Sequence, residues 1–191
     1  MTELLRSKKL GIPYLSQRDN VRNPGGSCNV TSIAMCLRWA GYDQPVSGQL
    51  EDVLYNYAID NGLSRHDGYD LATLFNSFAQ KARLTYRDDF TTRASMGQIK
   101  RQLTNGFPVV IHGYFTRSGH IIVATGFDDD AYDGAGALVV NDPWGEWHSW
   151  GYDTSINVSG KGLLYSYGMI ERLCTDPGKP SSIWAHIFSK L

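Results

Sequence analysis

A cysteine at the start of a predicted helix is the residue in this sequence best placed for nucleophilic chemistry. Cys28 follows a Pro-Gly-Gly-Ser segment, and the apolar residues after it recur at helical spacing, at Val30, Ile33, Ala34 and Leu37. Unpaired N–H groups and the positive dipole end at a helix N-terminus favour the thiolate, so such a position lowers a cysteine pKa from about 8.5. Cys28 is therefore a candidate nucleophile, although a free cysteine is often only a small buried hydrophobic residue.

A thiol nucleophile needs a base, and the base needs a third group to orient it. His120 opens an apolar run over residues 120–127, and Asp142 ends another over residues 137–142. If these runs form neighbouring antiparallel strands, the start of the first lies beside the end of the second, which brings His120 and Asp142 within hydrogen-bond reach. Taken singly, His120 could be a structural histidine and Asp142 a turn residue before a proline. Their joint placement with Cys28 favours catalysis.

Gln17 is a candidate oxyanion donor, because its side-chain NH₂ group could point at a developing negative charge. It stands between a short extended segment and a polar loop. Taken alone, a glutamine in such a place is more often a solvated loop residue.

The other four histidines and an acidic turn carry weaker signals. His112 lies within a predicted strand, where its ring could face the core or a cleft, and His148 lies among tryptophans. We interpret His66 and His186 as surface or edge residues. The acidic turn Asp128–Asp130 lacks the spacing of the twelve-residue calcium loop. We interpret this turn as solvated, and the sequence leaves calcium binding there open.

The elements that must position these residues are helices first and strands second. Helical periodicity predicts helices over residues 28–40, 49–61, 70–82 and 95–105. Apolar runs bounded by turn residues predict strands over residues 107–114, 120–127, 137–142 and 183–188. Short turns between the first three runs imply an antiparallel meander, and the last run could close the sheet. The order implies an α+β fold, with helices packed on an antiparallel sheet, in a single domain over residues 1–191.

The composition narrows the class of protein further. The chain has 191 residues, 42% hydrophobic and 19% charged, with a net charge of -1, which is typical of a globular domain without the basic surface of a nucleic-acid binder. No apolar run is long enough for stable membrane insertion. Three cysteines without a CxxC pair exclude a disulfide framework and a zinc signature, so we expect no metal. Residues Met1–Leu10 lack the apolar core of a signal peptide, which favours a cytoplasmic location.

Several short motifs together resemble the C39-like cysteine peptidases of the papain-like group. The motifs contain Gln17, the segment Ser27–Ser32, Gly119-His120 and the segment Asn141–Gly145, and the resemblance extends from about Gly11 to Gly145. It implies a papain-like fold in which Cys28 is the nucleophile, His120 the general base and acid, and Asp142 the orienting residue. Gln17 and the Cys28 backbone N–H would form the oxyanion hole. Such an enzyme acts on peptides and needs no cofactor.

One departure from the family pattern points to a branch of the family. Many members carry Cys-Gly-Pro-Thr-Ser, whereas this chain has Cys-Asn-Val-Thr-Ser at residues 28–32. The variant resembles the cell-wall-lytic, often phage-encoded branch, which implies a monomeric peptidoglycan endolysin that stays in the cytoplasm until host lysis. We expect the substrate to contact residues next to Cys28 and the aromatic segment after Asp142, namely Asn29, Trp144, Trp147, His148 and Trp150.

Three alternatives stay open at this point. The chain could be a general C39-like protease, an acyl-transfer enzyme with the same three residues, or a catalytically silent papain-like module that binds a glycan or peptide. The sequence also leaves open whether an endolysin of this kind would cut the stem peptide, the cross-bridge or the amide bond to muramic acid.

Overall fold

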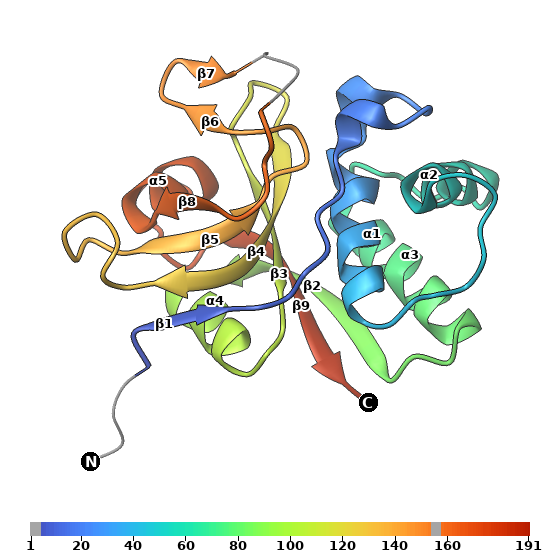
Figure 1. Cartoon of the computed structure of the whole chain (residues 1–191), viewed down its shortest axis with the longest axis horizontal. Coiled ribbons are helices and arrows are strands. Elements are labelled where there is room, and N and C mark those ends of the chain that lie inside the picture. Colours follow the sequence, from blue (N-terminus) through green and yellow to red (C-terminus); the bar gives the residue numbers. More distant parts are fainter. Residues whose placement is uncertain (1–4, 154–157) are drawn as a thin grey trace.

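Two groups of helices lie on either side of an antiparallel sheet (Figure 1). The computed structural model describes residues 5–153 and 158–191, so residues 1–4 of the Met1–Leu10 stretch lie outside the described residues. The helices are α1 (Cys28–Trp39), α2 (Leu50–Asp60), α3 (Gly68–Lys81), α4 (Met96–Thr104) and α5 (Tyr167–Cys174), with short 3-10 turns η1 (Gln17–Asp19) and η2 (Pro24–Gly26). None of the described helices combines the length and apolar character needed to cross a bilayer.

The described strands form one large sheet and a small hairpin. The strands are β1 (Ser7–Lys9), β2 (Tyr86–Ala94), β3 (Val109–Gly113), β4 (His120–Asp128), β5 (Ala137–Asn141), β6 (Trp147–His148), β7 (Gly151–Tyr152), β8 (Leu163–Ser166) and β9 (Ile183–Lys190). The large sheet has the order β2-β9-β3-β4-β5-β8, and β1 pairs with β4. All of its pairings are antiparallel. The predicted antiparallel α+β fold is confirmed, but β9 lies inside the sheet between β2 and β3.

Alternate residues of the central strands lie on opposite faces of the sheet and pack into two different hydrophobic cores. Val110 and Val123 pack with helices α1–α3, whereas Ile111 and Ile122 pack with α4 and α5. Because helices cover both faces of the sheet, strand β4 is buried from its first residue to its eighth. This burial explains why the sequence of β4 is a nearly continuous apolar run and not an alternating one.

Local chemistry explains most differences from the predicted elements. Helix α3 begins at Gly68, two residues before the predicted start, because the Asp67 side chain accepts hydrogen bonds from the Tyr69 and Asp70 N–H groups. The periodicity predicts neither β2 nor α5. Strand β2 is mostly polar because it lies at a sheet edge, and α5 spans only eight residues.

Candidate active site

The N-terminus of α1 is held in place by short contacts around Cys28. The single hydroxyl hydrogen of the buried Ser27 is shared between the carbonyls of Arg22 and Asn23, each 2.8 Å from Oγ. One turn into the helix, the Ser32 hydroxyl donates to the Ile121 carbonyl at 3.3 Å, which joins α1 to β4 next to His120. The Cys28 N–H is at the first position of α1, where a helix offers no acceptor of its own.

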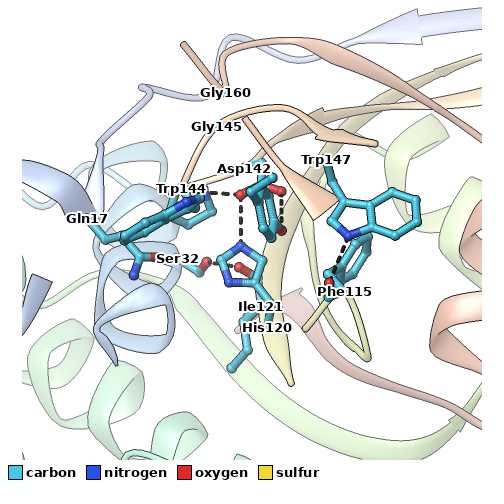
Figure 2. A network of polar contacts seen from close by, with 12 residues as sticks. Gln17, Ser32, Phe115, His120, Ile121, Asp142, Trp144, Gly145, Trp147 and Gly160 are labelled. Atoms are coloured by element: carbon cyan, nitrogen blue, oxygen red, sulfur yellow. Dashed lines mark hydrogen bonds and ion pairs between the residues drawn. The ribbon is translucent and has the colours of Figure 1, made fainter. Parts of the chain in front are cut away.

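His120 and Asp142 form a buried pair where β4 begins and β5 has just ended (Figure 2). His120 Nε2 lies 2.8 Å from Asp142 Oδ1, and the two side chains are 5% and 0% exposed. The Asp142 N–H donates to the Gly160 carbonyl at 2.8 Å. Only glycine fits at that position, because a Cβ on Gly160 would lie 1.8 Å from the Asp142 carbonyl oxygen. With Nε2 taken by Asp142, Nδ1 is the ring nitrogen left for Cys28.

Asp142 accepts four hydrogen bonds, which use both of its carboxylate oxygens. Oδ1 accepts from His120 and from the Trp144 N–H at 3.0 Å. Oδ2 accepts from the hydroxyls of Tyr152 and Tyr165, at 2.9 and 3.0 Å. Burial, and then the Asp142 charge, raise the pKa of both tyrosines well above the ordinary value, so both stay protonated donors. The sequence offers no local signal that would identify these two tyrosines as partners of Asp142.

The charges of Cys28 and His120 stabilise one another. Burial lowers the pKa of His120, but the Asp142 charge, the Cys28 charge and hydrogen bonds to both residues outweigh it and raise the pKa to about 10. Burial raises the pKa of Cys28, but the His120 charge and hydrogen bond, together with the Ile121 N–H, lower it overall. The arrangement therefore favours a thiolate beside an imidazolium, which is the reactive form of a cysteine nucleophile.

The pH dependence of Cys28 alkylation is one expected outcome of this pairing. The thiolate is the reactive form, so the rate of alkylation by iodoacetamide should rise with pH through the Cys28 pKa, at a pH below that of an ordinary thiol. In His120→Ala, the effect of burial on the Cys28 pKa is no longer opposed by the imidazolium, so the alkylation rate rises only at higher pH. Near neutral pH the alkylation rate then falls by about tenfold for each unit by which the thiol pKa rises above the pH of the measurement.

Two other cysteines serve as internal references for this measurement. Cys36 is fully buried, and burial followed by the Asp88 charge raises its pKa well above the ordinary value. Burial also raises the pKa of Cys174, to about 12. Peptide mass spectrometry should find the label on Cys28 first. An alkylation profile that is identical in wild type and His120→Ala would show that His120 does not control the thiol.

Gln17 is buried next to the segment that carries Asp142 (Figure 2). Its backbone N–H donates to the Pro143 carbonyl at 3.0 Å, and its Nε2 donates to the Pro24 carbonyl at 2.7 Å. The Pro24 contact fixes the orientation of the amide and uses one of its two N–H bonds. The Gln17 Oε1 has no hydrogen-bond partner among the described residues.

A cavity of about 540 Å³ opens over these residues. Gln17, Cys28 and His120 line it together with Trp144 and Tyr152. Its other walls come from the loop around His66, from the β3–β4 turn and from the segment between α5 and β9. A cavity of this size is in the range of small-molecule and peptide sites.

The structure separates the other residues expected to bind substrate. Trp144 lines the cavity, but the described lining residues do not include Trp147, His148 or Trp150. The Trp147 side chain points away from Asp142 and donates through Nε1 to the Phe115 carbonyl at 2.7 Å (Figure 2). His148 and Trp150 belong to the β6–β7 hairpin segment, where their rings stack at 4.7 Å. Adjacency to Asp142 in sequence therefore does not place these three side chains in the cleft.

Asn29 lines the cavity wall, but its side-chain amide forms hydrogen bonds within the protein. The residue is 2% exposed, and its Nδ2 donates to the Arg65 carbonyl at 2.7 Å. Arg65 in turn donates to the Gly26 carbonyl at 3.1 Å. Asn29 and Arg65 together tie the start of α1 and the loop that precedes it to the loop before α3.

The acidic turn near β4 contacts cations of the protein itself. Asp129 accepts from Lys100 at 2.6 Å and from the Tyr167 hydroxyl at 2.6 Å, while Asp130 pairs with Arg6. Within residues 5–153 and 158–191, no cluster of three or more His, Cys, Asp or Glu side chains is arranged to hold a metal ion.

The chain belongs to the Peptidase_C39 like family, whose model matches residues 9–172. This family and the fold together define a papain-like cysteine peptidase. None of the curated proteins matches the sequence.

Two solved structures show the same fold. One is described as a candidate C39-like peptidase from Bacillus anthracis, at 15% identity and a TM-score of 0.62, covering 97% of this chain and 98% of that one. The other is UfSP from C. elegans, at 16% identity and a TM-score of 0.57, covering 100% of this chain but only 35% of that one. At these identities the likeness establishes the shared fold alone.

Proposed function

We propose that this protein hydrolyses an amide bond in the peptide part of bacterial peptidoglycan, with Cys28, His120 and Asp142 as its catalytic triad. The observation that carries the proposal is the buried His120–Asp142 pair, which meets a cysteine at a helix N-terminus on the wall of an open cavity. This arrangement holds a reactive thiolate ready for a carbonyl carbon.

The proposed reaction proceeds in two steps. The Cys28 thiolate attacks the carbonyl carbon and forms a C–S bond, while the carbonyl electrons move onto oxygen. As the tetrahedral intermediate collapses, His120 gives its proton to the leaving amine and the C–N bond breaks. In the second step His120 takes a proton from water, the resulting hydroxide attacks the thioester, and the thiolate leaves. The Cys28 N–H and the second Gln17 N–H stabilise the oxyanion in both steps.

The aromatic residues on the walls of the cavity favour a substrate that carries sugar as well as peptide. Tyr114 and Trp184 line the cavity although they are 76% and 51% exposed. Trp144 adds a third aromatic ring, with the Arg18 guanidinium over its face at 5.4 Å. Exposed aromatic faces at a cleft offer stacking surfaces for sugar rings and flat peptide groups. The proposal includes action as a monomer on the cell wall after host lysis, as for an endolysin.

Digestion of purified peptidoglycan tests this proposal. Wild-type protein should clear suspensions of permeabilised or Gram-positive cells, and mass spectrometry of the released fragments should show one type of cleaved amide bond. Cys28→Ala should release nothing. If several wall chemotypes stay intact while unfolded casein is degraded, the protein is a general protease and the peptidoglycan proposal is wrong.

A further inference from the structure

A second hydrogen-bonded series of ionisable side chains, Asp88, His186 and His112, runs from the protein interior to the same cavity. His186 Nδ1 lies 2.7 Å from Asp88 Oδ2, and His186 Nε2 lies 3.0 Å from His112 Nε2. Strands β2, β9 and β3 bring these residues together, since β9 pairs with both of the others (Figure 1). The Asp88 and His186 side chains are 0% exposed. His186 is therefore a core residue, and its predicted place at the surface or edge is wrong.

The position of one proton decides what His112 presents to the cavity. The Asp88 carboxyl is fully buried, and its Oδ1 has no hydrogen-bond partner among the described residues, which favours a proton on Asp88 because a buried ionised carboxylate without compensation is costly. A proton on Oδ2 is donated to His186 Nδ1, so the ring proton of His186 lies on Nε2 and is donated to the Nε2 of His112. Burial raises the pKa of Asp88, which agrees with this placement.

His112 must then carry its own proton on Nδ1. Burial lowers the pKa of His112 to about 3, so the ring stays neutral, and a neutral ring that accepts from His186 at Nε2 carries its single proton on Nδ1. His112 lines the cavity, and its Nδ1 has no hydrogen-bond partner in the part of the chain that the structure describes. The ring is held by Phe90 at 5.4 Å and by the stacked His186 ring at 5.1 Å. The result is an N–H donor of fixed orientation.

We propose that His112 is a substrate-binding residue whose Nδ1–H donates a hydrogen bond to an acceptor oxygen of the substrate, a peptide carbonyl or a carboxylate. Asp88 and His186 act as positioning residues that fix the tautomer of His112. The inference rests on the proposed hydrolase function, because it assigns a role in the same cavity. It adds a second anchoring point, on β3, to the contacts made around Cys28.

Kinetics of His112 variants separate substrate binding from an effect on the thiol. His112→Ala should raise KM by about fivefold to tenfold, as expected for one lost hydrogen bond, with kcat little changed. The rate of Cys28 alkylation by iodoacetamide should stay unchanged. His112→Gln keeps both an acceptor for His186 and a donor for the cavity, so it should recover most of the lost affinity. Synthetic wall-type peptides with free or amidated carboxylates distinguish the two acceptors, since a bonded carboxylate gives the larger loss.

His148 provides the matched control, because its ring stacks on Trp150 and is not among the described residues that line the cavity. His148→Ala should leave KM unchanged. An unchanged KM in His112→Ala would overturn the proposal. So would a parallel fall in Cys28 alkylation, which would mean that His112 acts on the thiol. Urea unfolding of His112→Ala and His112→Gln checks that both variants are folded.

A direct reading of the tautomer tests the proposal independently of the substrate. Long-range ¹H–¹⁵N spectra of the wild-type protein, assigned by comparison with His112→Gln, should show the His112 proton on Nδ1. A proton on Nε2 would overturn the proposal, whichever polymer the enzyme cuts. If wild-type protein leaves peptidoglycan intact, the proposed function is wrong. The KM values of the His112 variants are then measured with casein as substrate. The tautomer measurement does not depend on the substrate and tests the role of His112 in either case.

Discussion

Replacing Cys28 by alanine should abolish hydrolysis while leaving the protein folded. Loss of the nucleophile, or of its base in His120→Ala, should lower kcat/KM by about 10⁵-fold or more, because such residues act as a unit. The fold should survive Cys28→Ala, because Ser27 and Ser32 hold the start of α1 independently of the thiol. Initial rates on solubilised peptidoglycan and circular dichroism measure the two properties.

A double variant sharpens this prediction. Cys28→Ala/His120→Ala should be little worse than either single variant, because the second loss removes nothing that still functions. Cys36→Ala is the matched control, since Cys36 lies on the same helix but is fully buried. It should keep its activity. Retention of full activity by Cys28→Ala would show that the thiol mechanism is wrong.

Replacing Asp142 should cost both activity and stability. Asp142→Ala leaves four hydrogen-bond donors without their acceptor and removes one partner of a buried pair, which costs about 3–5 kcal/mol of unfolding free energy. It also removes the charge that raises the pKa of His120. We expect kcat/KM to fall by about 10²–10⁴-fold, less than for Cys28→Ala. Urea denaturation and initial rates measure the two losses.

Two further variants separate charge from shape at this position. Asp142→Asn keeps an acceptor for His120 and the Trp144 N–H, so its stability should lie between those of wild type and Asp142→Ala while its activity still falls. Tyr152→Phe removes one of the four hydrogen bonds and keeps the ring, so it should cost only about 1 kcal/mol. If Asp142→Asn were as active as wild type, the Asp142 charge would have no catalytic role.

The sequence contains enough information to find the catalytic candidates, because each lies at the end of a strongly patterned element. Cys28 begins a helix with a clear apolar face, and His120 begins a strand that is apolar on both sides. Antiparallel pairing of the strands around 120–127 and 137–142 then leads to Asp142 without further information. The antiparallel α+β fold could be predicted for the same reason, because most of its helices and central strands are strongly patterned.

The parts of the site that sequence reasoning misses depend on distant pairings. Asp88 and His186 meet across 98 residues, and β2 is too polar to be distinguished from a loop. Tyr165 reaches Asp142 from β8, a strand of only four residues. Trp147 illustrates the converse, because its nearness to Asp142 in sequence predicts a cleft position, whereas its side chain points away from Asp142 and donates to the Phe115 carbonyl (Figure 2).

The place of β9 in the sheet has a consequence for how the chain folds during synthesis. Among the strands that the structure describes, β2 pairs only with β9, and Tyr86 pairs with Lys190. A growing chain must therefore hold both β2 and the outer edge of β3 unpaired until residues 183–190 emerge from the ribosome. Such long-range pairing slows folding and leaves strand edges open to association with other chains. The buried histidine pair behind the cavity wall is completed only with this late insertion.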